Sequence, residues 1–261
     1  MCTIALLLNA HPTWPLVVAA NRDEFYARPA TGLERVAEAP RALAGRDLER
    51  GGTWLGVNAV GFMAGLTNLR PTRPTLPAPR SRGEVVLEVL RLGDTQVACD
   101  LLASVDPADF NGGQLVFGTS DDLRIAYFRP EVRAVRIERV ANGVHVLATS
   151  TLDDPTYPKV DRLRRALAAL PPDWPGTRHA LVEALASHDA SPREAFPTDH
   201  ALFDQATLRA LDAVCIHTPA YGTRAATLIA AHADRVDHVE ATSDAPCRAD
   251  FVDFGPALRG A

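Results

Sequence analysis

The chain has 261 residues, of which 47% are hydrophobic and 23% are charged, and its formal net charge at pH 7 is -5. This composition is typical of a folded protein with a sizeable core, and it excludes extensive disorder. The modest negative charge offers no basic surface to nucleic acid, so we expect no nucleic-acid partner.

The cysteines indicate the compartment. The chain contains four of them, Cys2, Cys99, Cys215 and Cys247, with no CxxC spacing and no dense disulfide framework. We therefore expect reduced thiols in a cytoplasmic protein. The start of the chain has no basic leader, and no apolar stretch reaches the ~18 residues of a membrane span, so we predict neither export nor insertion. Without repeats or a composition break, residues 1–261 are predicted to form one domain.

The first predicted structure is a hairpin. Apolar runs cover residues 4–8 and 16–20, and a turn-rich stretch, 9–15, separates them. The polar residues Asn21-Arg22-Asp23-Glu24 end the second run. Because antiparallel pairing places the end of the second strand beside the start of the first, Cys2 is expected next to this polar group.

The following hundred residues alternate between polar loops and short elements. We interpret residues 25–50 as a long surface excursion, and 53–58 with 62–67 as a second hairpin that ends at Asn68. Residues 70–80 are too rich in proline for a helix or a central strand, and their three arginines are interpreted as solvated rather than as a pocket rim.

Helices and further strands complete the chain. Ser81 and Asp94 are predicted to cap helices over 82–92 and 95–103. Short spacings, and Asn-Gly at 142–143, predict antiparallel hairpins among strands at 115–117, 125–128, 132–137 and 144–147. Helices are then predicted at 160–170, 178–186 and 204–211, and strands at 213–217, 223–231, 236–241 and 251–254. This order suggests two stacked antiparallel sheets with helices on their outer faces.

Cys2 is the first candidate for chemistry. Removal of Met1 would leave it with a thiol of pKa near ~8.5 and an α-amine of pKa near ~7.7 to 8.0, so the amine could accept the thiol's proton. One residue would then supply both the attacking atom and the base. The alternative is a small buried residue that opens a strand, and Cys2 taken alone favours that alternative.

The polar residues after the second strand change this balance. Arg22 beside Cys2 would favour the thiolate, Asp23 could accept hydrogen bonds from the α-ammonium, and Asn21 or Glu24 could orient them. The alternative is a turn held by a surface ion pair of Arg22 with an acidic neighbour. These residues alone leave both interpretations open.

Several motifs together resemble the NRDE family, also called the transport and Golgi organization protein 2 family. They are Cys2, residues 21–24 (NRDE), residues 51–58 (GGTWLGVN), residues 65–68 (GLTN) and residues 221–224 (YGTR). The resemblance spans the whole chain. It implies an α+β fold, the four-layered αββα sandwich of N-terminal-nucleophile (Ntn) hydrolases.

The resemblance also implies roles for individual residues. Cys2 would be the nucleophile, with Arg22 and Asp23 as its partners, and Asn68 would donate to an oxyanion. Asn21, Glu24 and Arg224 are assigned to substrate binding. One departure stands out: residues 148–153 (ATSTLD) lack an asparagine that the family often has at this place, so a second oxyanion donor is missing there if that asparagine supplies it.

Two functions follow from the resemblance. The first is an Ntn-type hydrolase that uses Cys2 on an amide or thioester of a small or lipid-like substrate, without a cofactor. The second is a non-catalytic protein that binds and traffics haem, or lipid and acyl-CoA, on the same fold. A purely structural interaction module would explain the fold but not the clustered polar motifs.

The remaining chemistry-bearing residues are interpreted as structural. Cys215 and His217 would share one face of a strand and could supply two metal ligands, but no further ligands follow at a matching spacing. We therefore predict a core thiol with an ordinary histidine, and no metal site. Trp54 and Phe62 are assigned to the core.

Overall fold

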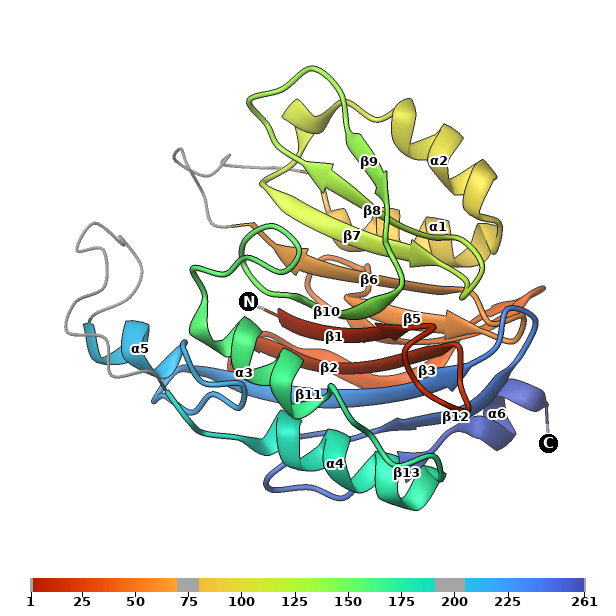
Figure 1. Cartoon of the computed structure of the whole chain (residues 1–261). Helices are drawn as coiled ribbons and strands as arrows, with labels where there is room; N and C mark the ends of the chain where they lie inside the picture. The colour runs from red at the N-terminus through yellow and green to blue at the C-terminus, as the bar shows by residue number, and fades with distance from the viewer. Residues whose placement is uncertain (1, 70–79, 191–204, 261) are drawn as a thin grey trace.

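Two antiparallel sheets lie face to face in the computed structural model, which describes residues 2–69, 80–190 and 205–260 (Figure 1). The first sheet has the spatial order β10 (Gly143–Leu147), β1 (Cys2–Leu8), β2 (Leu16–Phe25), β11 (Tyr221–Ala231), β12 (Val236–Ala241) and β13 (Val252–Asp253). The second has the order β3 (Ala30–Glu38), β4 (Arg41–Asp47), β5 (Leu55–Asn58), β6 (Met63–Asn68), β7 (Gly113–Gly118), β8 (Leu123–Phe128) and β9 (Arg136–Arg139). Neighbouring strands in both sheets pair antiparallel, as predicted.

Helices cover the outer face of each sheet. Figure 1 shows α1 (Arg82–Leu92) and α2 (Thr95–Ala103) on one side of the molecule, and α3 (Pro158–Ala166) and α4 (Trp174–Ala186) on the other. The predicted αββα sandwich is therefore confirmed. Shorter helices are η1 (Pro107–Asp109), α5 (Gln205–Ala210) and α6 (Gly255–Arg259). Among the described residues, no helix is both long and apolar enough to cross a membrane.

The apolar runs of β1 and β2 form the centre of the sandwich. Because successive residues of a strand face opposite sides, Ile4 and Leu6 pack between the two sheets while Ala5 and Leu7 pack under α3 and α4. All four side chains are buried. This burial on both faces explains why the run at 4–8 is continuously apolar rather than alternating.

Residues 25–50 contradict the predicted surface excursion. Strand β2 continues to Phe25, and β3 and β4 then form an antiparallel hairpin at one edge of the second sheet. Most of β3 is exposed or half-buried. Strand β3 is therefore held by its backbone hydrogen bonds to β4. These bonds need no apolar pattern, so the sequence of β3 resembles that of a loop.

The hairpin predicted from Asn-Gly at 142–143 is also wrong. Strand β9 pairs with β8 in the second sheet, whereas β10 pairs with β1 in the first. Residues 140–142 therefore cross between the sheets. The side-chain amide of Asn9 donates to Oδ1 of Asn142 at 2.9 Å, so the crossing is tied to the turn between β1 and β2.

Several other boundaries differ from the predictions. Helix α3 ends at Ala166, and α4 begins at Trp174, where Asp173 caps it by accepting from the Gly176 N–H at 2.8 Å. Ser81 occupies the N-cap of α1, but its side chain makes no capping hydrogen bond. Residues 213–217 form no strand; they make only a bridge between His217 and Gly222. Of the proline-rich stretch, residues 70–79 lie outside the described residues.

Candidate active site

Strands β1 and β2 bring Cys2 to the polar residues as predicted. In their register Cys2 lies opposite Arg22, and Thr3 lies opposite Asn21. Cys2 and Arg22 follow the inward-facing positions of the two strands, so both point toward the layer between the sheets. The hairpin thus places a thiol and a guanidinium at one end of the inter-sheet core.

A cavity of about 210 Å³ opens at this end. Five of the predicted site residues line it: Cys2, Arg22, Asp23, Glu24 and Asn68. The second hairpin therefore does bring Asn68 to the first. Other lining residues include Trp54, Arg82 and Asn111, which were not predicted as site residues.

Arg22 is a buried cation above an aromatic ring. The central carbon of its guanidinium lies 4.3 Å from the centroid of Trp54, a cation–π contact. Among the described residues no carboxylate forms an ion pair with Arg22. Burial lowers the pKa of its guanidinium. Gly45 on β4 makes room for the ring, since a Cβ there would lie 2.3 Å from Trp54. Trp54 is thus part of the cavity wall as well as packed against the core.

Asp23 is buried beside the cavity and held by strand β11. The Thr223 hydroxyl donates to Asp23 Oδ1 at 2.7 Å, and the Tyr221 hydroxyl donates to the Asp23 backbone carbonyl at 2.8 Å. Burial raises the pKa of Asp23 to about 6, against the opposing effects of Lys159 and the Thr223 hydrogen bond. The motif at 221–224 therefore acts through its tyrosine and threonine, which the sequence interpretation did not single out.

Arg82 is a second cation in the cavity. It is the first residue of α1, and its guanidinium donates to the Gly112 carbonyl. Burial lowers its pKa to about 10, so it stays protonated at neutral pH. The start of α1 reaches the cavity because a Cβ at Gly52 would lie only 2.1 Å from Gly83, a contact that glycine alone allows. The Gly-Gly at 51–52 was the one signal in the sequence for this approach.

Asn21 does not reach the cavity. Its position faces the helices rather than the second sheet, and its side-chain amide donates to the carbonyls of Leu185 and Val214, both at 2.9 Å. The side chain is buried there. Asn21 thus joins β2 to α4 and to the segment that precedes β11.

Arg224 also lies apart from Cys2. Its Nη1 donates to the carbonyls of Phe25, Tyr26 and Arg28 at 3.1, 3.1 and 2.8 Å, so it holds the turn after β2. It lines a separate cavity of about 110 Å³. Among the residues that the structure describes, Arg22 and Trp54 alone line both cavities.

The segment 148–153 is held away from the cavity. Gln114 donates its side-chain amide to the carbonyls of Ala148, at 2.9 Å, and of Ser150. None of residues 148–153 is among the cavity-lining residues. The side-chain amides that do line the cavity are those of Asn68 and Asn111.

Known proteins are similar to this chain in sequence. The sequence profile of the family described as Transport and Golgi organisation 2 matches residues 1–245. The chain belongs to this family. The bovine (Bos taurus) Transport and Golgi organization protein 2 homolog is 31% identical over 251 residues, and the human (Homo sapiens) homolog is 30% identical over 254 residues. Each alignment covers 90% of both chains.

Solved structures share the fold. The Caenorhabditis elegans N-acylethanolamine-hydrolyzing acid amidase ortholog superposes with a TM-score of 0.53 at 11% identity, over 88% of this chain and 92% of that one. A mutant of the conjugated bile acid hydrolase from Clostridium perfringens superposes with a TM-score of 0.51 at 11% identity, over 97% and 92%. This chain therefore has the fold of these two proteins, the Ntn-hydrolase fold.

Proposed function

We propose that this protein is an Ntn-type hydrolase in which Cys2 attacks the carbonyl of an amide or thioester in a small or lipid-like substrate. The observation that carries the proposal is the shared cavity of Cys2, Arg22, Asp23 and Asn68. The two solved structures of the same fold are named for an N-acylethanolamine-hydrolyzing amidase and a conjugated bile acid hydrolase. Their names agree with acyl transfer to a nucleophile.

The first step needs a base, because burial raises the pKa of the Cys2 thiol. After removal of Met1, the α-amine of Cys2 would take the thiol proton. The sulfur then forms a bond to the carbonyl carbon, and the carbonyl oxygen becomes an oxyanion. Arg22, opposite Cys2 in the strand register, stabilises the thiolate before attack.

The second step expels the leaving group. The tetrahedral intermediate collapses, the carbon–nitrogen or carbon–sulfur bond breaks, and the α-ammonium returns its proton to the leaving amine or thiolate. Water then adds its oxygen to the thioester carbonyl carbon while the α-amine takes one of its protons; the bond from carbon to the Cys2 sulfur breaks, the acid is released, and the α-ammonium returns the proton to the thiolate. Amide donors at Asn68 and Asn111 would stabilise both oxyanions, and a donor of this kind is worth ~2.7 to 4 kcal/mol.

The cavity limits what enters it. Its volume of about 210 Å³ is below the ~300 to 1,000 Å³ of pockets that enclose a whole drug-sized ligand. It would accept the reacting acyl group and its nearest polar atoms. The remainder of a lipid-like substrate would lie outside the volume that the described residues enclose.

The test is the chemistry of Cys2. We expect intact mass spectrometry to show loss of Met1, and a limiting iodoacetamide pulse to label Cys2 at least about tenfold faster than Cys99, a half-buried thiol on α2. Hydrolysis of a panel of N-acyl and S-acyl substrates should disappear in Cys2→Ala and persist in Cys99→Ser. Retention of Met1, or equal labelling of the two thiols, would contradict the mechanism.

A second candidate function has its own observation. Arg22 and Arg82 face the cavity without a carboxylate ion-pair partner among the described residues, and two such cations favour an anionic ligand. Haem propionates and the phosphates of acyl-CoA have this chemistry, as a binding and trafficking role in lipid metabolism would require. Saturable binding of haem or acyl-CoA that persists in Cys2→Ala and weakens in Arg82→Gln, with no hydrolysis product, would favour carriage over turnover.

A further inference from the structure

Four potential metal ligands meet on the helix side of the first sheet, outside the Cys2 cavity. They are His188, Cys215, His217 and Cys247, and one ligand atom from each lies within 4.8 Å of all the others. His188 follows α4, Cys215 and His217 precede β11, and Cys247 follows β12. The spacing of Cys215 and His217 had suggested two ligands only; the fold supplies the other two.

The distances among the ligand atoms of Cys215, His217 and Cys247 fit a tetrahedral zinc ion. The two Sγ atoms are 3.6 Å apart, and Nε2 of His217 lies 3.7 Å from Cys215 Sγ and 3.2 Å from Cys247 Sγ. Zinc binds sulfur at ~2.3 Å and nitrogen at ~2.0 to 2.1 Å, so tetrahedral ligands are about 3.8 Å apart for two sulfurs and about 3.6 Å apart for sulfur and nitrogen. An ion would need only small movements of these side chains.

The backbone already orients the fourth ligand. Nδ1 of His188 lies 3.0 Å from the carbonyl oxygen of Cys215. A carbonyl only accepts, so Nδ1 carries the proton and Nε2 keeps the lone pair that a metal needs. Histidine ligands are usually held by this kind of outer hydrogen bond. The backbone N–H of Cys215 donates in turn to the Ser187 carbonyl at 2.8 Å, which joins the same two segments again.

We propose that His188, Cys215, His217 and Cys247 form a structural zinc site that joins the end of α4 to the segments beside β11 and β12. Two thiolates and two imidazoles are a donor set suited to zinc, and four protein ligands leave no open position for substrate. None of the four lines the Cys2 cavity, so the ion takes no part in the reaction proposed there.

The site supports the wall behind Asp23. The segment at 213–217 holds Thr223 through two hydrogen bonds: the Ile216 N–H donates to Thr223 Oγ1 at 2.9 Å, and the Thr223 N–H donates to the Ile216 carbonyl at 2.8 Å. Thr223 itself donates to Asp23. Because this segment forms no strand of its own, a metal cross-link would replace the ladder of hydrogen bonds that a strand would have there.

The test is metal binding by the full chain, purified under reducing conditions without chelator. We expect inductively coupled plasma mass spectrometry to find about one zinc ion per chain. Cobalt(II) should then replace zinc and give the visible d–d bands of tetrahedral coordination and a thiolate-to-cobalt charge-transfer band. X-ray absorption should find sulfur and nitrogen neighbours at ~2.3 Å and ~2.0 to 2.1 Å.

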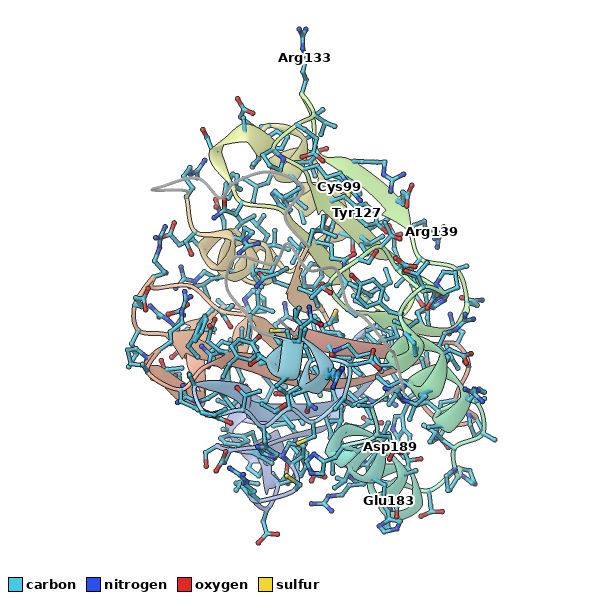
Figure 2. The ribbon with its side chains drawn as sticks, turned by 90° about the vertical axis from the view of Figure 1, so that its left-hand side faces the viewer. Cys99, Tyr127, Arg133, Arg139, Glu183 and Asp189 are labelled. Atoms are coloured by element: carbon cyan, nitrogen blue, oxygen red, sulfur yellow. The ribbon has the colours of Figure 1, made fainter. Side chains whose placement is uncertain are left out.

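Variants at exposed positions separate ligand loss from misfolding. Cys247→Ser and His188→Ala change exposed side chains, so both variants should fold. Both should lower cobalt affinity at least about tenfold, because loss of a residue that only hydrogen-bonds to a metal ligand already has an effect of this size. Cys99→Ser is the matched control, because Cys99 lies on α2 at the opposite end of the molecule from Asp189, the neighbour of His188 (Figure 2). It should bind cobalt as the unmodified chain does.

Three outcomes would overturn the proposal. The first is a chain that binds neither metal at micromolar concentration. The second is equal cobalt binding by Cys247→Ser and Cys99→Ser. The third is a Cys215–Cys247 disulfide in peptide maps of protein isolated without reductant, since the two sulfurs are 3.6 Å apart and could pair instead. Cys2→Ala should bind cobalt fully, so failure of the zinc site and failure of the Cys2 mechanism remain distinguishable.

Discussion

Asp23 carries its carboxylate in a buried position between Thr223 and the Cys2 cavity. Burial alone would favour the neutral acid, whereas the Thr223 hydroxyl and the buried Lys159 favour the charged form. The balance leaves the pKa of Asp23 at about 6, above the ordinary value of 3.8. A raised acid pKa means that the folded chain holds a proton that the unfolded chain has lost, so this group's contribution to stability declines as pH rises from about 4 to about 6.

The corresponding prediction concerns reactivity. We expect the rate of Cys2 alkylation, and of any turnover, to fall as pH drops through about 6, because protonated Asp23 has lost the negative charge that stabilises the α-ammonium formed when the α-amine takes the thiol proton. Thr223→Val should move the midpoint upward by about one pH unit, since a hydrogen bond to a charged group is worth ~1.5 to 3 kcal/mol. Both effects are measured from the rate of Cys2 alkylation as a function of pH.

A control on the same strand keeps this prediction specific. Thr227 is also buried on β11 but lies opposite Ala20 rather than Asp23, so Thr227→Val should leave the midpoint near that of the parent chain. Equal midpoints for all three proteins would show that Asp23 does not set the profile.

At the scale of elements, β10 and the turn after it are held by a charged pair. Nδ1 of His145 lies 2.6 Å from Asp153 Oδ2, and the Val146 N–H donates to Asp153 Oδ1 at 2.8 Å. The hydrogen bond with Asp153 raises the pKa of His145, whereas burial opposes it. Asp153 has a φ of 56°, a left-handed conformation that aspartate tolerates, and lies in the turn that follows β10 and residues 148–151.

This pair predicts a pH-dependent stability. Because the folded pKa of His145 is raised, its contribution is fully present below the unfolded value of about 6.5 and is lost as pH rises through the folded value. His145→Gln should therefore lower the free energy of unfolding by about 1 to 2 kcal/mol at pH 5.5, and by less at pH 8.5. Urea unfolding at the two pH values measures the difference.

His179 provides the comparison. It forms an i,i+4 pair with Glu183 on α4, but both side chains are largely exposed, at 75% and 69%. Exposed pairs of this kind contribute little, so His179→Gln should leave stability nearly unchanged at both pH values. A loss for His145→Gln that is the same at both pH values would contradict the role of the protonated ring.

At the scale of the whole molecule, the layer between the sheets draws on both ends of the sequence. It contains Leu6 and Val18 from the first hairpin, Val116 from the second sheet and Val239 from the end of the first sheet. Because each sheet covers one face of this layer, neither can bury its apolar residues without the other. We therefore predict one cooperative unfolding unit for residues 1–261.

The test is a truncation in that layer. Leu6→Ala removes a fully buried side chain and should lower the free energy of unfolding by about 2 to 5 kcal/mol, with tryptophan fluorescence and far-ultraviolet circular dichroism still showing a single shared transition. Leu48→Ala, at a leucine that is 60% exposed, should change stability little. Separate transitions for the two probes would indicate two domains.

Local patterns in the sequence account for much of the fold. Residue alternation and turn chemistry identify the hairpin of β1 and β2, and antiparallel pairing alone requires that Cys2 meet Arg22 at its open end. The helices at 82–92 and 95–103 have the predicted bounds, since apolar spacing and caps act within a few residues, although only Asp94 forms a side-chain cap.

Long-range contacts set the rest. Strand β3 is held by backbone hydrogen bonds that need no apolar side chains, so its sequence carries no strand pattern. Strand β10 pairs with β1, which is far away in sequence, and local spacing could not predict that pairing. For the same reason, local spacing did not predict that Arg82 and Trp54 line the cavity. Spacing along the chain shows only which residues share an element, so the identity of Cys2's neighbours, and of the partners of Cys215, depends on how the elements pack.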